Sequence, residues 1–309
     1  MALFYDRLNK FKGRVGFYPA DFSRLFDKPR SLNLVRMLYK VRNFPPERII
    51  CLTEETVETL YLLGEQDRIV GVTGYAVRPS VVREEKERVA AFTSAKIDRI
   101  LSLQPDLVLA FSDLQANIAA DLIKSGVAVM AYNQRDISGI LAMIRHLGAI
   151  VGVGKKAEEL ASSYEERIED IQIKRKNIYR PRVYFEEWDS PMITGIKWVS
   201  ELIEIAGGQD VFFELSRNKA ATDRIVAPQQ VINASPNIIV ASWCGKKVRS
   251  EKFHEREGWS VVPAIKKNCI YEIKSSLILQ PGPAALTDGL DKLVQILDLY
   301  NHGKHDLAY

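Results

Sequence analysis

The sequence predicts an α/β protein of two lobes, with mainly parallel sheets flanked by helices, joined by one long rigid helix. The first observation is a degenerate repeat: residues 99–110 read RILSLQPDLVLA, and residues 230–241 read QVINASPNIIVA. Each copy is typical of a helix end followed by a buried strand, because Pro105 and Pro236 cannot continue a helix. The second observation is one uninterrupted amphipathic helical pattern between the copies. A repeated α/β unit on either side of a rod predicts two similar lobes that hold a ligand between them.

Length and composition set the class of protein. The chain has 309 residues, of which 47% are hydrophobic and 27% charged, which is an ordinary composition with enough length for two cores. Its longest apolar runs fall far short of the ~20 residues of a membrane-spanning helix. The amino terminus shows neither a secretory signal nor a lipoprotein cysteine pattern, so we expect a cytoplasmic protein, or a periplasmic one only if an export segment was removed. The three cysteines form no disulfide framework and no zinc pattern: Cys51, Cys244 and Cys269.

The first 45 residues are predicted to be a basic N-terminal extension. Residues 1–50 hold eleven Lys or Arg and four Asp or Glu, although the whole chain carries only +4. Ser31 can begin a helix with one apolar face, which Pro45 and Pro46 would stop. This helix either packs on the first lobe or presents a docking surface to an acidic partner or an anionic membrane. Nucleic acid is not expected as a partner, because no nucleic-acid motif is recognised.

Strand and helix patterns alternate through residues 46–153, the predicted N-terminal lobe. Such alternation favours a parallel sheet with helices on both faces. The predicted strands are residues 49–52, 68–72, 107–110 and 127–132. The predicted helices begin at Thr53 or Thr56 and run to Leu63, and cover residues 97–103 and 116–124.

The bridging helix is predicted over residues 154–178. Apolar residues recur at three- and four-residue spacing, and about 20 helical residues span roughly 30 Å, the width of a small domain. These stripe residues are Ala157, Leu160, Ala161, Tyr164, Ile168 and Ile171. The C-terminal α/β lobe follows over residues 179–309. Its predicted strands are residues 182–185, 237–242 and 269–273, and its predicted helices are residues 198–205 and 284–300.

Several short segments, in order, resemble one known family. They are residues 48–52 (RIICL), 70–75 (VGVTGY), 91–100 (AFTSAKIDRI), 105–111 (PDLVLAF), 236–241 (PNIIVA) and 280–283 (QPGP). Over residues 46 to about 300 the chain resembles the helix-bridged substrate-binding proteins of ABC importers, and is most similar to the vitamin B12-binding branch, whose relatives carry siderophores and haem. The resemblance implies a non-catalytic protein, without an intrinsic cofactor, that binds a corrinoid (cobalamin-like) or related metal chelate for uptake or delivery.

The resemblance further implies a flat ligand between two lobes that move little, gripped by loops at the carboxyl ends of the strands. Aromatic rings in those loops would supply contact area, and a few polar groups would fix the orientation of the ligand. Packing inside the lobe cores explains the same aromatic residues. The candidate ligand-binding residues are Tyr75, Phe92, Phe111, Trp188, Trp243 and Gln280.

The resemblance also implies docking on an ABC permease through one carboxylate of each lobe. Asp98 occupies the first of these positions, but the second falls on the neutral Gln229. Half of the docking pair is therefore missing. Together with the missing export signal and the basic extension, this departure favours a protein that binds a ligand of the family type without serving a standard periplasmic importer. The possible partners are an ABC permease or a cytoplasmic acceptor protein.

Other functions have weaker support in the sequence. Signatures of phosphate-binding loops, serine hydrolases, zinc proteases and dinucleotide folds are absent. The acidic run Glu186, Glu187 and Asp189 leaves open a cytoplasmic enzyme that modifies such a cofactor. A scaffold whose partner docks on residues 1–45 is a further alternative. No protein metal site is expected, although His254 could reach a metal centre of the ligand, and a solvated tail explains His302 and His305.

Overall fold

The computed structural model describes residues 44–303. Residues 1–43 and 304–309 lie outside the described residues, and so do the predicted helix at Ser31, His305 and almost all of the basic extension. The described residues, 44–303, belong to one compact unit in terms of internal contacts. Over residues 44–303, no helix is both long enough and apolar enough to cross a bilayer.

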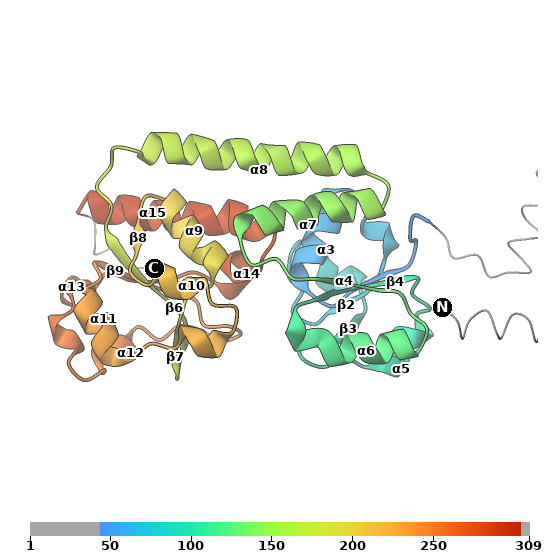
Figure 1. Cartoon of the computed structure of the whole chain (residues 1–309), viewed down its shortest axis with the longest axis horizontal. Coiled ribbons are helices and arrows are strands. Elements are labelled where there is room, and N and C mark those ends of the chain that lie inside the picture. Colours follow the sequence, from blue (N-terminus) through green and yellow to red (C-terminus); the bar gives the residue numbers. More distant parts are fainter. Residues whose placement is uncertain (1–43, 304–309) are drawn as a thin grey trace, which may run out of the picture. The chain divides into compact units, whose positions relative to one another are not determined.

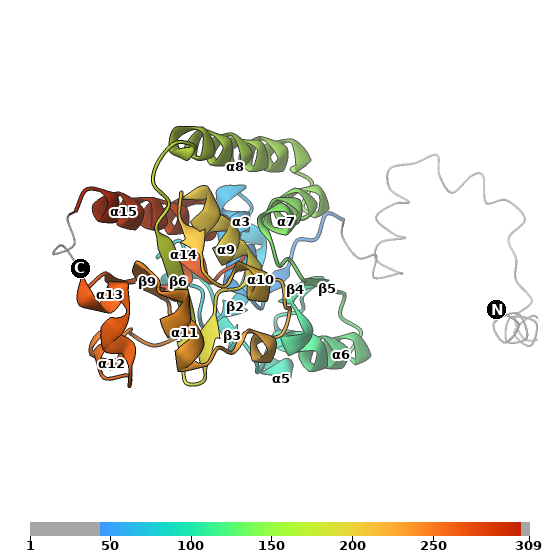
Figure 2. The ribbon, with the colours of Figure 1, turned by 60° about the vertical axis from the view of Figure 1, so that its left-hand side comes forward.

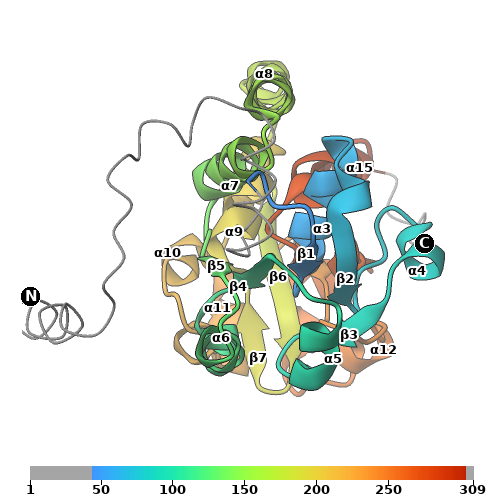
Figure 3. The same ribbon diagram turned by 90° about the vertical axis from the view of Figure 1, so that its right-hand side faces the viewer.

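The first sheet has five parallel strands in the order β3-β2-β1-β4-β5. The strands are β1 (Ile49–Cys51), β2 (Ile69–Thr73), β3 (Arg88–Ala90), β4 (Leu107–Phe111) and β5 (Val129–Tyr132). The helices are α3 (Glu54–Leu62), α4 (Val82–Glu85), α5 (Ile97–Ser102), α6 (Ala116–Lys124) and α7 (Ile137–Ile150). In Figure 3 this sheet lies between α3 and α7 on one side and α5 and α6 on the other.

Alternate side chains of β1 belong to different apolar clusters, which explains why helices cover both faces of this sheet. Ile49 and Cys51 belong to the apolar cluster that includes α3 and α7, whereas Ile50 and Leu52 belong to the cluster that includes α5 and α6. Successive strand residues point to opposite faces, so an unbroken apolar run requires a helical layer on each side.

The second sheet runs β10-β9-β6-β7, and the short strand β8 also pairs with β6. All pairs are parallel except β6–β7, which form an antiparallel hairpin. The strands are β6 (Arg182–Asp189), β7 (Met192–Thr194), β8 (Gln209–Asp210), β9 (Ile238–Ala241) and β10 (Ile270–Glu272). The helices are α9 (Lys197–Ile205), α10 (Phe213–Ser216), α11 (Pro228–Ala234), α12 (Glu251–His254), α13 (Pro263–Lys266), α14 (Ser275–Ile278) and α15 (Leu290–Asn301).

One 22-residue helix, α8 (Gly154–Arg175), connects the two lobes and lies alongside α7 and α15 (Figures 1 and 2). Only three of its side chains are buried: Ala157, Ala161 and Tyr164. Ion pairs hold the rest of the helix. Arg145 of α7 binds Glu158 and Glu165, and on the other lobe Arg167 and Arg175 bind Asp291 and Asp298 of α15. The predicted fold class is confirmed: two α/β lobes joined by one long helix.

Helices α7 and α8 approach most closely at Gly148. A Cβ atom added at this position would overlap the Cβ of Ala157 on α8. A residue without a side chain is therefore required here, because the helices could otherwise not pack at this separation.

The internal repeat is confirmed as the same local structure in both lobes. α5 leads into β4, and α11 leads into β9. The residue before each proline, Gln104 or Ser235, is left-handed, with φ of 47° and 46° respectively. In both copies the helix therefore ends on the same strained conformation, directly before the proline that stops it.

An arginine at the start of each lobe fixes this unit to the central strand. Arg48 donates from Nε to the carbonyl of Leu103 (3.0 Å), and Arg182 donates from Nε to the carbonyl of Ala234 (2.9 Å). The backbone N–H groups of the same two arginines donate to the side chains that follow the prolines, at 3.0 Å and 2.8 Å. Those acceptors are Asp106 and Asn237. The two lobes thus share side-chain contacts as well as an order of elements.

The apolar core differs from the two separate cores that the length suggested. The largest buried cluster continues from α3 and α7 of the first lobe into α9 and α15 of the second. Each lobe has a second cluster of its own on the opposite face of its sheet. The lobes share a core because helices from both pack together on the side of α8.

The predicted helix over residues 284–300 is interrupted by a change of helix type. Residues Ala285–Gly289 form a π-helix, and regular α15 begins only at Leu290. A Cβ on Gly289 would overlap the carbonyl oxygen of Leu277. Close packing against the chain around α14 accompanies the wider turn, which periodicity alone does not reveal.

Candidate functional site

Sheet topology identifies one preferred ligand position in each lobe. From β1 the chain moves outward to β2 and β3 and then returns to β4 on the other side of β1. Open α/β sheets bind ligands at such a reversal, beyond the carboxyl ends of the two strands. The reversal lies between β1 and β4 in the first lobe and between β6 and β9 in the second. We call the segments at these strand ends the switch loops. They are residues 52–54 after β1, residues 112–115 after β4, residues 242–246 after β9, and residues 187–190, where β6 continues beyond its parallel pairing with β9.

The first switch loop brings Glu54 to the start of α3. Burial raises the pKa of this half-buried carboxyl to about 8, and the neighbouring acids Glu55 and Glu58 raise it further. Burial also raises the pKa of Glu55 to about 7, against a hydrogen bond of 2.6 Å from Thr53 Oγ1. The first turn of α3 therefore holds carboxyl groups that retain protons near neutral pH.

The acidic run after Tyr184 is fully engaged in ion pairs. Glu186 is 0% exposed, and Arg256 binds both of its oxygens, at 2.6 and 2.8 Å. The buried Arg224 binds Glu187 at 2.6 Å.

Asp189 is the third member of this run, and Lys246 and Lys252 both bind it. Burial would raise its pKa, but the hydrogen bonds from the two lysines lower it to about 2. All three carboxylates are thus paired with cations, which is not the environment of a general acid or base.

The switch loops of the two lobes differ in their charged groups. Burial raises the pKa of the Cys244 thiol in the second lobe, and the negative charges of Glu187 and then Glu54 raise it further. Direct contacts bridge the lobes nearby: Gln134 Nε2 donates to the carbonyl of Pro281 at 3.0 Å, and Gly282 packs against Glu55.

Three of the candidate aromatic residues keep ring surface accessible. Tyr75 is 51% exposed, directly after β2, and Phe92 is half-buried after β3. Trp188 is half-buried near the end of β6, and Lys246 Nζ lies 4.0 Å from the centre of its ring.

The other three candidates are less accessible. Phe111 and Trp243 are 6% and 2% exposed, and the ring of Trp243 stacks on Phe253 with 5.9 Å between ring centres. The Arg135 guanidinium lies over Phe111, 5.4 Å from the ring centre. Gln280 is half-buried beside Pro281.

The predicted docking residues both lie on the surface. Asp98 is in the first turn of α5, and Gln229, in the first turn of α11, donates from Nε2 to Asn233 Oδ1 at 2.8 Å. His254 is exposed, with Nε2 3.3 Å from Asn268 Oδ1. Within residues 44–303, no group of three or more His, Cys, Asp or Glu is arranged to hold a metal ion.

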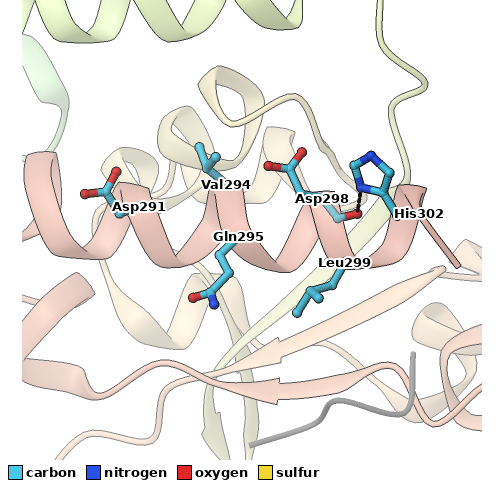
Figure 4. A pocket seen from close by; sticks show the side chains of 6 residues that line it. All are labelled: Asp291, Val294, Gln295, Asp298, Leu299 and His302. Carbon is cyan, nitrogen blue, oxygen red and sulfur yellow. Dashed lines mark hydrogen bonds between the residues drawn. The ribbon is translucent and has the colours of Figure 1, made fainter. Parts of the chain in front are cut away.

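Two surface hollows lie elsewhere. One of about 320 Å³ runs along α15 and is lined by residues such as Asp291, Asp298 and His302 (Figure 4). Another of about 490 Å³ lies between residues 247–251 and residues 268–272, beside the edge strand β10. Neither hollow is lined by any of the six candidate ligand-binding residues.

Sequence reasoning missed polar residues of the switch loops. Glu54 and Cys244 follow the strands β1 and β9 directly, so strand order combined with position could have identified them. Gln115 carries no sequence signal, because its role depends on three loops that only the tertiary structure brings together.

The raised pKa values predict that stability falls as the pH rises. Glu54 (pKa about 8), Glu55 (about 7) and Asp210 (about 6) bind protons more tightly in the folded than in the unfolded chain. Between about pH 5 and pH 8 the unfolded state therefore holds fewer protons, and the free energy of unfolding should drop by at least about 1 kcal/mol. Urea denaturation across this range measures the slope. Glu54→Gln should flatten it, whereas the exposed Glu159→Gln on α8 should not; a slope that Glu54→Gln leaves unchanged would contradict this assignment.

Comparison with known proteins agrees with this architecture. A family model described as "Periplasmic binding protein" matches residues 49–277. The ABC transporter substrate-binding lipoprotein YvrC of Bacillus subtilis is 28% identical over 261 residues, which cover 81% of this chain and 79% of that protein. The vitamin B12-binding protein of Vibrio parahaemolyticus is 27% identical over 249 residues, which cover 79% of this chain and 87% of that protein.

A solved structure shows the same fold. The apo form of a periplasmic heme-binding protein from Roseiflexus superposes with a TM-score of 0.70 at 22% identity, over 81% of this chain and 98% of that one. At this level of identity the match concerns the fold alone.

Proposed function

Because this chain belongs to the periplasmic binding protein family, we propose that it binds a corrinoid, or a related metal chelate, between its two lobes for uptake or delivery. Family members are binding proteins rather than enzymes, and the ion pairs of Glu186, Glu187 and Asp189 agree with that. The relatives named as vitamin B12-binding proteins support the corrinoid as the first ligand to test.

The observation that carries this proposal is the contact between the lobes beside the first switch loop, where Gln134 Nε2 donates to the carbonyl of Pro281 at 3.0 Å and Gly282 packs against Glu55. A corrin ring is broad and mostly apolar, with amide groups at its rim. The accessible rings of Tyr75, Phe92 and Trp188 suit its faces, and the carboxyl groups of Glu54 and Glu187 suit its amide N–H groups.

Calorimetric titration with cyanocobalamin, cobinamide, haem and a ferric siderophore tests the proposal. We expect binding of at least one corrinoid, and a loss of about 1 to 2 kcal/mol in Tyr75→Ala and in Trp188→Ala, because each removes ring contact with the ligand. Tyr179→Ala is the matched control: its ring is 64% exposed, beyond the end of α8, so its removal should leave affinity unchanged.

The titration separates the related ligands. If haem or the siderophore binds and neither corrinoid does, the corrinoid is wrong as the proposed ligand, and a related metal chelate takes its place. Absence of heat and of spectral change with all four compounds would refute the proposal. Equal losses in all three variants would refute the placement of the ligand at Tyr75 and Trp188.

We further propose that the partner is an ABC permease, which agrees with the relative named as an ABC transporter substrate-binding lipoprotein. Asp98 is the proposed contact on the first lobe, and Gln229 occupies the corresponding position on the second. One relative is named a lipoprotein and one structural neighbour a periplasmic protein, which supports a periplasmic location over a cytoplasmic one. Fractionation of cells that produce the full-length protein distinguishes the two locations.

A further inference from the structure

Gln115 links three separate loops of the first lobe. Its side chain is almost completely buried, at 1% exposure. Nε2 donates to the carbonyl oxygens of Leu52 (3.2 Å) and Phe92 (2.8 Å), and Oε1 accepts from the backbone N–H of Phe111 (2.9 Å). The amide therefore uses both of its donor hydrogens and its acceptor on main-chain groups.

The sheet alone does not hold these three loops together. Phe111 ends β4 and Leu52 follows β1, and these two strands are paired. Phe92 follows β3, which pairs with β2 and has no ladder to β1 or β4. The hydrogen bond from Gln115 ties the loop of Phe92 to the switch loops that carry Glu54.

Local backbone geometry delivers Gln115 to this position. Ser112 takes a left-handed conformation with φ of 61°, and its Oγ accepts from the N–H of Leu114 at 3.3 Å. The chain thereby turns back directly after β4, and the side chain at position 115 returns to the N–H of residue 111. One N–H group and two carbonyl groups of the three loops need partners. A neutral glutamine amide provides the one acceptor and the two donor hydrogens that they require.

We propose that Gln115 is a positioning residue of the ligand site, which sets the loops of Glu54 and Phe92 in the arrangement that the ligand meets. Its consequence for ligand affinity rests on the proposed function; its consequence for loop order does not. Removal of the amide would leave two carbonyl groups and one N–H buried without partners, so the three loops would open together.

Amide hydrogen exchange of the ligand-free protein tests loop order. In Gln115→Met, we expect exchange at Phe111 and in residues 53–55 and 93–95 to rise at least tenfold. In Gln115→Glu, the acceptor remains while the two donors are lost. Phe111 should then stay protected while the other two loops exchange faster, a split that general destabilisation does not produce.

Asp106→Ala is the matched control. Asp106 accepts from the backbone N–H groups of Glu47 (2.8 Å) and Arg48 (3.0 Å), at the opposite end of β4. Its loss also removes hydrogen bonds between side chain and main chain in this lobe, but away from the switch loops. The control should destabilise the lobe without selective exchange in the three loops.

Titration with cyanocobalamin, cobinamide, haem and a ferric siderophore, using the same variants, tests the ligand site. For each compound that the wild type binds, Gln115→Met should raise Kd at least tenfold, and Asp106→Ala should change it less than threefold. The positioning role would be overturned if the three loops of Gln115→Met exchanged amide hydrogens as slowly as those of the wild type. It would also be overturned if they exchanged faster while the affinity for the ligand stayed unchanged. If the wild type binds none of the four compounds, the proposed function fails, and the exchange data still decide whether Gln115 orders the loops.

Discussion

Replacement of Arg256 by methionine should lower the free energy of unfolding by about 3 to 5 kcal/mol, because it leaves a buried carboxylate without its counter-charge. Glu186 would lose both guanidinium hydrogen bonds and keep only those from Tyr184 and Trp243, at 2.9 and 3.1 Å. Methionine retains most of the apolar stem of Arg256 but loses the guanidinium group, whose central carbon lies 4.5 Å from the ring centre of Phe253. Urea denaturation at neutral pH measures the loss.

The double variant Glu186→Gln with Arg256→Met is the control for this prediction. It removes the charge together with its partner, while the glutamine oxygen can still accept from Trp243, so much of the lost stability should return. Equal stability of the single and double variants would show that lost packing, rather than the isolated charge, causes the effect.

Gly148→Ala is expected to lower the free energy of unfolding by about 2 to 3 kcal/mol, since it inserts a methyl group into the closest contact of α7 and α8. The new Cβ would overlap that of Ala157, and both positions are buried. Alanine is otherwise a better helix former than glycine, so propensity alone predicts the opposite sign. Thermal or urea unfolding of the variant decides between the two.

A double variant that swaps the residues at positions 148 and 157 provides an internal test. Ala157→Gly alone should cost about 1 kcal/mol through helix propensity. In the double variant Gly148→Ala with Ala157→Gly, the methyl group only changes helix. The double variant should therefore be more stable than the sum of the single losses predicts, by 1 kcal/mol or more. Additive losses would mean that the helices do not meet at this pair.

Much of the fold follows from local sequence signals. Strong apolar runs and their stops predicted β1, β4 and α6 to within one residue and α8 to within three. The short strands β3 and β7 were missed, because three residues are too few to show a period. The shared core was also missed, since the same apolar stripe can face its own lobe or the neighbouring one.

The candidate site was less predictable than the fold. The rule for open sheets predicts which loops to test for ligand contact, and aromatic residues in those loops are easy to find in the sequence. Exposure separates them: Tyr75 is open to solvent, whereas Trp243 packs inside the second lobe. Whether a ring after a strand turns outward depends on its neighbours in space, as does the pairing of Glu187 with Arg224, which is 37 residues away.

The matched hydrogen bonds of Arg48 and Arg182 show that the two lobes are built alike at the start of their central strands. The loops at the other ends of those strands differ in chemistry: one lobe has acids near α3, and the other has tryptophans flanked by lysines. If the ligand lies between these loops, as we propose, its two faces meet different chemical groups, so we expect it to bind in one orientation.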